Sequence, residues 1–164
     1  MRISTDSLAF ALGGAADALT LVSSGTSLPA ALNLTFENLR APPSARGAIQ
    51  DLSYRSMRSW GLSKALVNEL VDAPPQQERL ASLLRISLGL LADSSQPYPE
   101  HTVVDQSVTA CAADRELARA KGVVNAVLRR FLRERDRLLK TTNSDEEARW
   151  NYPQWWINKV RSDW

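Results

Sequence analysis

The stretch that most constrains the fold covers residues 117–140, LARAKGVVNAVLRRFLRERDRLLK. Its apolar residues recur at every third or fourth position, which predicts one long helix with a buried face. This face consists of Val124, Val127, Leu128, Phe131, Leu132, Leu138 and Leu139. The opposite side of the predicted helix carries a stripe of Gly122, Asn125, Arg129, Arg133 and Arg137.

Basic charge is concentrated in the same stretch. Residues 119–140 contain eight basic and two acidic side chains, whereas the net charge of the whole chain is +2. The rest of the chain is therefore net acidic. Such a run is either a solvated helix surface or an electrostatic footprint for phosphate groups, and the residues alone leave both interpretations open.

Shorter apolar-periodic segments precede this helix, and glycines and prolines separate them. No segment keeps a period of two and the linkers are short, so the sequence predicts an all-α bundle of about seven helices. The expected helices cover about residues 5–24, 27–39, 44–60, 62–71, 77–93, 100–113 and 117–140. The leucine-rich segment 77–93 is expected to be the central buried helix. Gly25 is expected to end the first helix, and Gly61 to mark a corner before the fourth.

The length and the cysteine content indicate one domain of a cytoplasmic protein. A chain of 164 residues is long enough for its own core. Its single cysteine excludes an internal disulfide framework and fits a reducing compartment. No apolar run reaches the ~18 residues that a membrane span needs, and the helical spacing near the N-terminus argues against a signal peptide.

The residues that usually carry catalysis are scarce. His101 is the only histidine, and a cap or surface role is expected for it. Cys111 lies in an apolar stretch and is expected to be a buried structural thiol. A zinc site is not expected from one histidine and one cysteine, and no glycine-rich phosphate loop is present. The sequence therefore predicts no catalytic residue, no metal site and no enzyme activity for this chain alone.

The character of the chain changes after residue 140. Ser144 is expected to cap a short helix, with Glu147 three residues later. Four of the five tryptophans fall in the last fifteen residues: Trp150, Trp155, Trp156 and Trp164. So aromatic a tail either folds back on the bundle or begins a second domain that continues beyond the chain. The sequence favours the second alternative.

RNA is the partner that the basic helix suggests. The planar guanidinium group of arginine can bind phosphate oxygens or stack on an unpaired base. The predicted RNA-binding residues are Lys121, Asn125, Arg129, Arg130, Arg133 and Arg137. For Asn125 a structural role, pinning a neighbouring loop against the helix, is favoured over a nucleotide contact. Gly122 would let another backbone approach, and Tyr54, Arg55 and Arg58 are weaker candidates.

Three segments, in the expected order, resemble the NusB-like family. Residues 121–130 (KGVVNAVLRR) resemble its last-helix signature, and residues 99–111 (PEHTVVDQSVTAC) resemble the preceding helix. Residues 45–62 (ARGAIQDLSYRSMRSWGL) resemble its third helix. The resemblance covers about residues 5–140 and implies a NusB-like bundle of about seven helices that binds RNA.

The tail resembles one branch of this family. The residues EARWNYPQWWINKV are similar to the link between the bundle and the catalytic domain in rRNA cytosine-C5 methyltransferases of the RsmB (Sun/Fmu) type. Tyr152 stands where that link usually has histidine. The resemblance thus divides the chain into a NusB-like domain at 1–140 and, at 141–164, a linker with the start of a methyltransferase region.

That branch implies an S-adenosylmethionine-dependent methyl transfer to a cytosine of 16S rRNA in the small subunit. The catalytic cysteines and the cofactor loop would lie outside this chain, so no cofactor is expected within it, and Cys111 is assigned neither role. The implied partners are small-subunit rRNA and the chain's own methyltransferase domain, with no membrane. Two alternatives stay open: a NusB-type transcription antitermination factor, and a protein-docking scaffold whose arginines only solvate the bundle.

Overall fold

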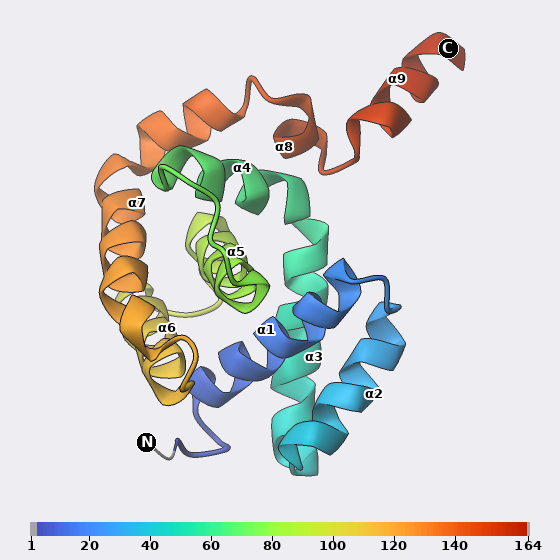
Figure 1. Ribbon diagram of the computed structural model, residues 1–164. Coiled ribbons are helices and arrows are strands. Elements are labelled where there is room, and N and C mark those ends of the chain that lie inside the picture. The colour runs from blue at the N-terminus through green and yellow to red at the C-terminus, as the bar shows by residue number, and fades with distance from the viewer. Residues whose placement is uncertain (1–2, 164) are drawn as a thin grey trace.

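The computed structural model describes residues 3–163 and is all-α, as the sequence predicted (Figure 1). Seven helices form the bundle and two more follow in the tail of the described chain. The bundle helices are α1 (Leu8–Ser23), α2 (Leu28–Leu39), α3 (Pro43–Arg58), α4 (Trp60–Leu70), α5 (Glu78–Ala92), α6 (Glu100–Ala113) and α7 (Lys121–Thr142). A 3-10 turn, η1 (Ala118–Ala120), precedes α7, and α8 (Glu146–Trp150) and α9 (Gln154–Asp163) form the tail. Trp164, part of the predicted aromatic tail, lies outside the described residues.

Helix α5 is the centre of the bundle, as predicted. It packs against α1, α3, α4, α6 and α7, which surround it in Figure 1. Leu84 and Leu88 have no exposed surface. The buried hydroxyl of Ser87 donates to the carbonyl of Leu83 (2.8 Å) and pairs with the hydroxyl of Ser107 on α6 (2.7 Å). Because both buried hydroxyls are satisfied, this polar contact fixes the register between α5 and α6 without an orphaned group.

The residues predicted to end the first helix and to begin the second are confirmed. Gly25 follows the end of α1 with a φ of 111°, a conformation that glycine adopts without steric cost. Ser27 caps α2, and its hydroxyl accepts from the amide of Ala30 (3.4 Å). Pro29 lies in the first turn of α2, where its missing N–H costs no hydrogen bond.

The role predicted for Gly61 is wrong. Gly61 is not a corner, because Ser59 separates α3 from α4 and Gly61 lies inside α4. It is the point where α8 crosses α4. A Cβ at Gly61 would overlap the carbonyl oxygen of Glu147 and lie 2.7 Å from its carbonyl carbon. The side-chain oxygen of Asn151 accepts from the amide of Leu62 (3.1 Å) at the same crossing.

Replacing Gly61 with alanine is therefore expected to displace α8 from α4. Overpacking a tight contact usually costs about 1–3 kcal/mol. Hydrogen exchange should show faster exchange at the α8 amides while the α5 amides keep their protection. Gly47→Ala is the matched control, since a Cβ at Gly47 on α3 meets nothing within 4 Å. Unchanged exchange of α8 in Gly61→Ala would contradict the docking described here.

The long basic helix is interrupted, contrary to the prediction of one continuous helix over 117–140. It begins as η1, continues as α7, and bends at Glu134, whose φ and ψ are −115° and 19°. Beyond the bend, Arg135 occupies the inward position between buried Phe131 and Leu138. Its guanidinium donates to the carbonyl of Leu91 at the end of α5 (3.2 Å) and to Glu100 at the start of α6 (2.6 Å). Arg135 thus joins three helices and belongs to the scaffold.

The tail folds back on the bundle only in part. Helix α8 folds back on α4, whereas α9 packs against α8 and projects away from the bundle (Figure 1). The predicted cap of α8 is off by one residue. The carboxylate of Asp145 accepts from the amides of Glu147 (2.9 Å) and Ala148 (3.3 Å), while the hydroxyl of Ser144 bonds back to the carbonyl of Thr141 (2.7 Å).

Among the helices of residues 3–163, none combines the length and the apolar character needed to cross a membrane.

Candidate nucleic-acid interface

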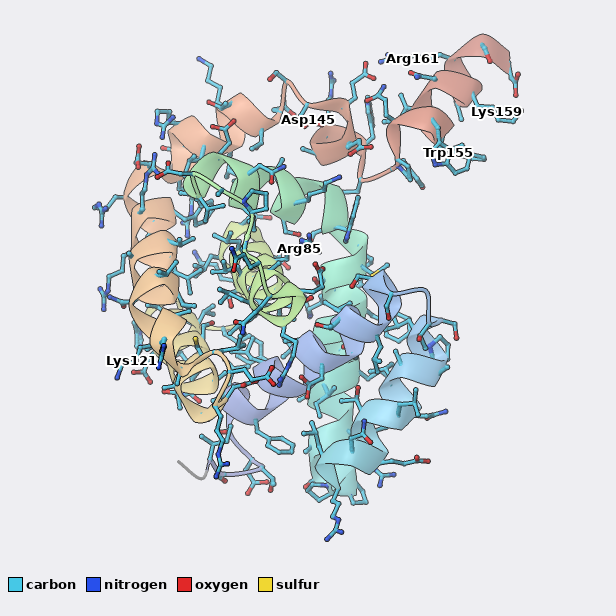
Figure 2. All side chains as sticks on the ribbon, in the orientation of Figure 1. Arg85, Lys121, Asp145, Trp155, Lys159 and Arg161 are labelled. Carbon is cyan, nitrogen blue, oxygen red and sulfur yellow. The ribbon has the colours of Figure 1, made fainter. Side chains whose placement is uncertain are left out.

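Helix α7 places a basic strip along one edge of the molecule. The strip consists of Lys121, Arg129, Arg130, Arg133 and Arg137. Its inward face is buried through Val124, Leu128 and Phe131, so the residues on the other side face solvent. Figure 2 shows Lys121 at the start of this helix, at the opposite end of the molecule from α9. The structure thus brings the six predicted site residues onto one helix. Lys121, Arg129, Arg133 and Arg137 are exposed, and Asn125 and Arg130 are half-buried.

Asn125 positions an arginine instead of a loop. Its side-chain oxygen accepts from Nε of Arg129, one turn further along α7 (3.0 Å). The predicted loop contact is therefore wrong. Because this hydrogen bond uses only Nε, the outer nitrogens of the Arg129 guanidinium remain directed toward solvent. Asn125 thus restricts the orientation of the Arg129 guanidinium while leaving it accessible to a ligand.

Glu134 pairs with two of the six predicted residues, a contact that the sequence interpretation missed. Its carboxylate accepts from Nε of Arg130 (2.7 Å) and from Nη2 of Arg137 (2.6 Å). These hydrogen bonds hold the pKa of Glu134 below its usual range, so it stays ionised at neutral pH. The i−4 and i+3 spacing of the two arginines was the available signal. Within the described chain, the other three predicted cations, Lys121, Arg129 and Arg133, have no ion-pair partner.

Arg129 also borders a groove of about 350 Å³ between α6 and α7. Its apolar lining is formed by Val104, Val108 and Leu132. The polar lining from α6 consists of Glu100, His101 and Asp105, and that from α7 consists of Asn125 and Arg129. His101 is exposed, as predicted, but Pro99 and not His101 precedes the helix as its cap. Sequence reasoning did not place these two polar sets together, because they are 20 residues or more apart in the chain.

The remaining predicted contacts are not part of this surface. A Cβ at Gly122 would meet nothing within 4 Å. The expected approach of another backbone at Gly122 is therefore absent among the described residues. Arg55 pairs with Asp51 (2.8 Å) and Asp93 (3.4 Å) on the side of α3, which lies across the bundle from α7 in Figure 1. The weaker candidates on α3 (Tyr54, Arg55 and Arg58) are therefore separate from the basic strip.

Cys111 is a buried structural thiol, as predicted. Its Sγ donates to the carbonyl of Leu117 (3.0 Å), and burial raises the pKa of the thiol to about 11. The neutral thiol is a poor nucleophile and a poor metal ligand. No cluster of three or more histidine, cysteine, aspartate or glutamate side chains within residues 3–163 is arranged to hold a metal ion.

The chain is similar to proteins named ribosomal RNA small subunit methyltransferase B. It is 30% identical over 155 residues to the protein of Pseudomonas putida, covering 92% of this chain and 34% of that protein. A protein of Coxiella burnetii, named "Probable ribosomal RNA small subunit methyltransferase B", is 30% identical over 126 residues, 77% of this chain and 29% of the relative. The Vibrio cholerae protein is 27% identical over 165 residues, 96% and 37% of the two chains. No family model matches the chain. The chain thus spans about a third of the length of these relatives.

Proposed function

We propose that this chain, which is homologous to part of the RsmB-type rRNA methyltransferases, is the RNA-binding N-terminal domain of such an enzyme. In this proposal residues 1–140 bind or orient small-subunit rRNA in the cytoplasm. The rest of the enzyme transfers a methyl group from S-adenosylmethionine to C5 of a cytosine. The observation that carries the proposal is the exposed basic strip on α7 in a chain whose relatives are named for rRNA methylation.

The chemistry of the strip supports contacts with an RNA backbone. Arg129 and Arg133 are four residues apart on one helix, so their Cα atoms are separated by ~6 Å along the axis. Their guanidinium groups can each bind phosphate oxygens with two nitrogens. The apolar side of α7 fixes the helix on the bundle. The two arginines are therefore held on a rigid helix when they bind the phosphates.

S-adenosylmethionine has no evident place among the described residues. Within residues 3–163 no strand leads into a glycine-rich loop, the arrangement that nucleotide-like cofactors commonly use. We therefore assign the cofactor and the methyl transfer to the remainder of the enzyme. The residues of this chain act on RNA alone.

We further propose that the methyltransferase domain covers the aromatic surface of α8 and α9. A groove of about 290 Å³ is lined there by Trp150, Tyr152, Trp156, Ile157, Val160 and Arg161. Trp155 is also 67% exposed. Exposed aromatic surface of this kind usually marks an interface. Residues 141–164 are then the linker and the start of the methyltransferase region.

The experiment that tests the RNA-binding role is a titration of a fluorescent small-subunit rRNA hairpin with this chain, followed by anisotropy between 50 and 200 mM salt. Binding that weakens as salt rises is the expected result, because phosphate contacts release counterions. If the hairpin does not bind at low salt, the bundle is a docking scaffold and the proposed role is wrong.

Replacing Glu134 with glutamine is expected to strengthen binding of the same hairpin by about 3- to 10-fold at 0.1 M salt. The change removes the charge that holds Arg130 and Arg137, so both become available to phosphate. The salt slope should also steepen, by up to about 0.7 per released arginine. Glu116→Gln is the control, because Glu116 is an exposed acid that lies outside α7. An equal gain in both variants would indicate only a change in net charge.

A further inference from the structure

The groove between α6 and α7 has the chemistry of a base-binding site. Val104, Val108 and Leu132 offer an apolar surface to a flat ring, and Arg129 lies at its border. Arginine can stack on an unpaired base. The hydrogen bond from Arg129 to Asn125 already restricts the Arg129 side chain, so stacking costs less conformational entropy. The volume of about 350 Å³ is ample for one nucleobase.

Asp105 distinguishes this groove from a plain phosphate contact. One of its carboxylate oxygens accepts from the side-chain amide of Gln106 (3.1 Å), and Gln106 accepts in turn from the amide of Ala9 (3.0 Å). The carboxylate is thus tied to α1 through Gln106. Its other oxygen has no hydrogen-bond donor among the described residues. Glu100, the other acid of the groove, is already paired with Arg135.

An unneutralised carboxylate beside a phosphate-binding strip repels RNA unless the RNA brings a donor to it. The exocyclic amines of cytosine, adenine and guanine are such donors, whereas uracil presents a carbonyl oxygen at the position where cytosine has its amine. Asp105 is exposed, so solvent reaches its second carboxylate oxygen in the free chain. A base that fills the groove excludes this solvent, and a base without an amine then leaves the oxygen unsatisfied.

We infer that this groove holds one unpaired, amine-bearing base of the bound RNA, with Asp105 accepting from its exocyclic amine. The inference rests on the proposed RNA-binding function and adds base selection to it. The base stacks between the face of the Arg129 guanidinium and the apolar lining, while the edge of that guanidinium and Arg133, one turn further along α7, bind the neighbouring phosphates. The helix bundle then contributes sequence preference as well as affinity.

The test compares oligocytidine and oligouridine 10-mers at pH 8 and 0.1 M salt, with the wild-type chain, Asp105→Asn and Asp136→Asn. The wild type should bind oligocytidine about 10-fold more tightly, the discrimination expected from one hydrogen bond to a charged group. Asp105→Asn should reduce the preference to within about twofold. Asp136→Asn removes an exposed acid of α7 outside the groove and should strengthen binding of both RNAs equally.

Two results would overturn the inference while leaving the proposed function intact. One is salt-dependent binding of both RNAs with equal affinity by the wild type. The other is a preference for oligocytidine that Asp105→Asn leaves unchanged. If neither RNA binds at low salt, the proposed function itself fails, and the inference fails with it.

Discussion

Replacing Lys121, Arg129 and Arg133, the cations of the basic strip that Glu134 does not hold, with alanine is expected to weaken binding of a small-subunit rRNA hairpin about 100-fold at 0.1 M salt. Each phosphate contact on single-stranded RNA contributes about 0.7 to the log–log salt slope, and therefore about 0.7 log units of affinity at 0.1 M salt. Three lost contacts amount to about two log units. All three side chains are exposed, so the bundle should keep its stability. Anisotropy titration gives the affinities, and circular dichroism confirms the fold.

The matched control removes three positive charges that lie outside the basic strip. Arg58, Arg149 and Lys159 are exposed on α3, α8 and α9 and lie off the basic strip. Their replacement with alanine lowers only the general attraction between the chain and RNA, which is largely screened beyond about 10 Å at this salt concentration. We expect a loss of about threefold or less. Equal losses in the two triple variants would mean that RNA does not dock on α7.

Replacing Phe131 with alanine is expected to lower the free energy of unfolding by about 3–5 kcal/mol. Phe131 has no exposed surface, lies on the inward face of α7, and packs beneath the guanidinium of Arg135, 5.6 Å from its ring centre. The truncation leaves a cavity where α7 joins the core. It also loosens the helix that carries the basic strip. Urea denaturation followed by circular dichroism measures the change.

Val123→Ala is the control for this prediction. Val123 lies on the same helix but is 50% exposed, so its truncation should change stability by no more than about 0.5 kcal/mol. A similar small effect at Phe131 would contradict the packing of α7 described here.

The helices and the buried face of α7 could be predicted from the sequence because both follow from local patterns. The spacing of Val124, Leu128 and Phe131 is a property of one segment, and the structure buries all three. Gly25 and Ser27 act within a few residues of their own helix ends. Such features do not depend on how the helices pack, so the sequence alone is sufficient for them.

The features that could not be predicted depend on contacts between distant segments. From the sequence, Gly61 was predicted to be a corner. Its role as the contact point for α8 depends on a segment more than 80 residues further along the chain. Arg135 reads as one more surface cation, yet it reaches the end of α5 and the start of α6. The pairing of Asp105 on α6 with Arg129 on α7 as two sides of one groove likewise requires the packed bundle.

The candidate site divides in the same way. That the basic residues share one helix was predictable, because helical periodicity places them there. Their availability was not predicted, although Glu134 lies at helical spacing from Arg130 and Arg137. Counting charges along a segment overlooks such pairs.

The most direct test of the central claim, that RNA docks on the basic strip of α7, is the salt slope of hairpin binding. It is measured for the wild type and for the variant lacking Lys121, Arg129 and Arg133. The account predicts that the slope of log affinity against log salt becomes shallower by about two in the variant, since three contacts at about 0.7 each are lost. A slope that is the same in both proteins would contradict it, because the RNA would then be held by other residues.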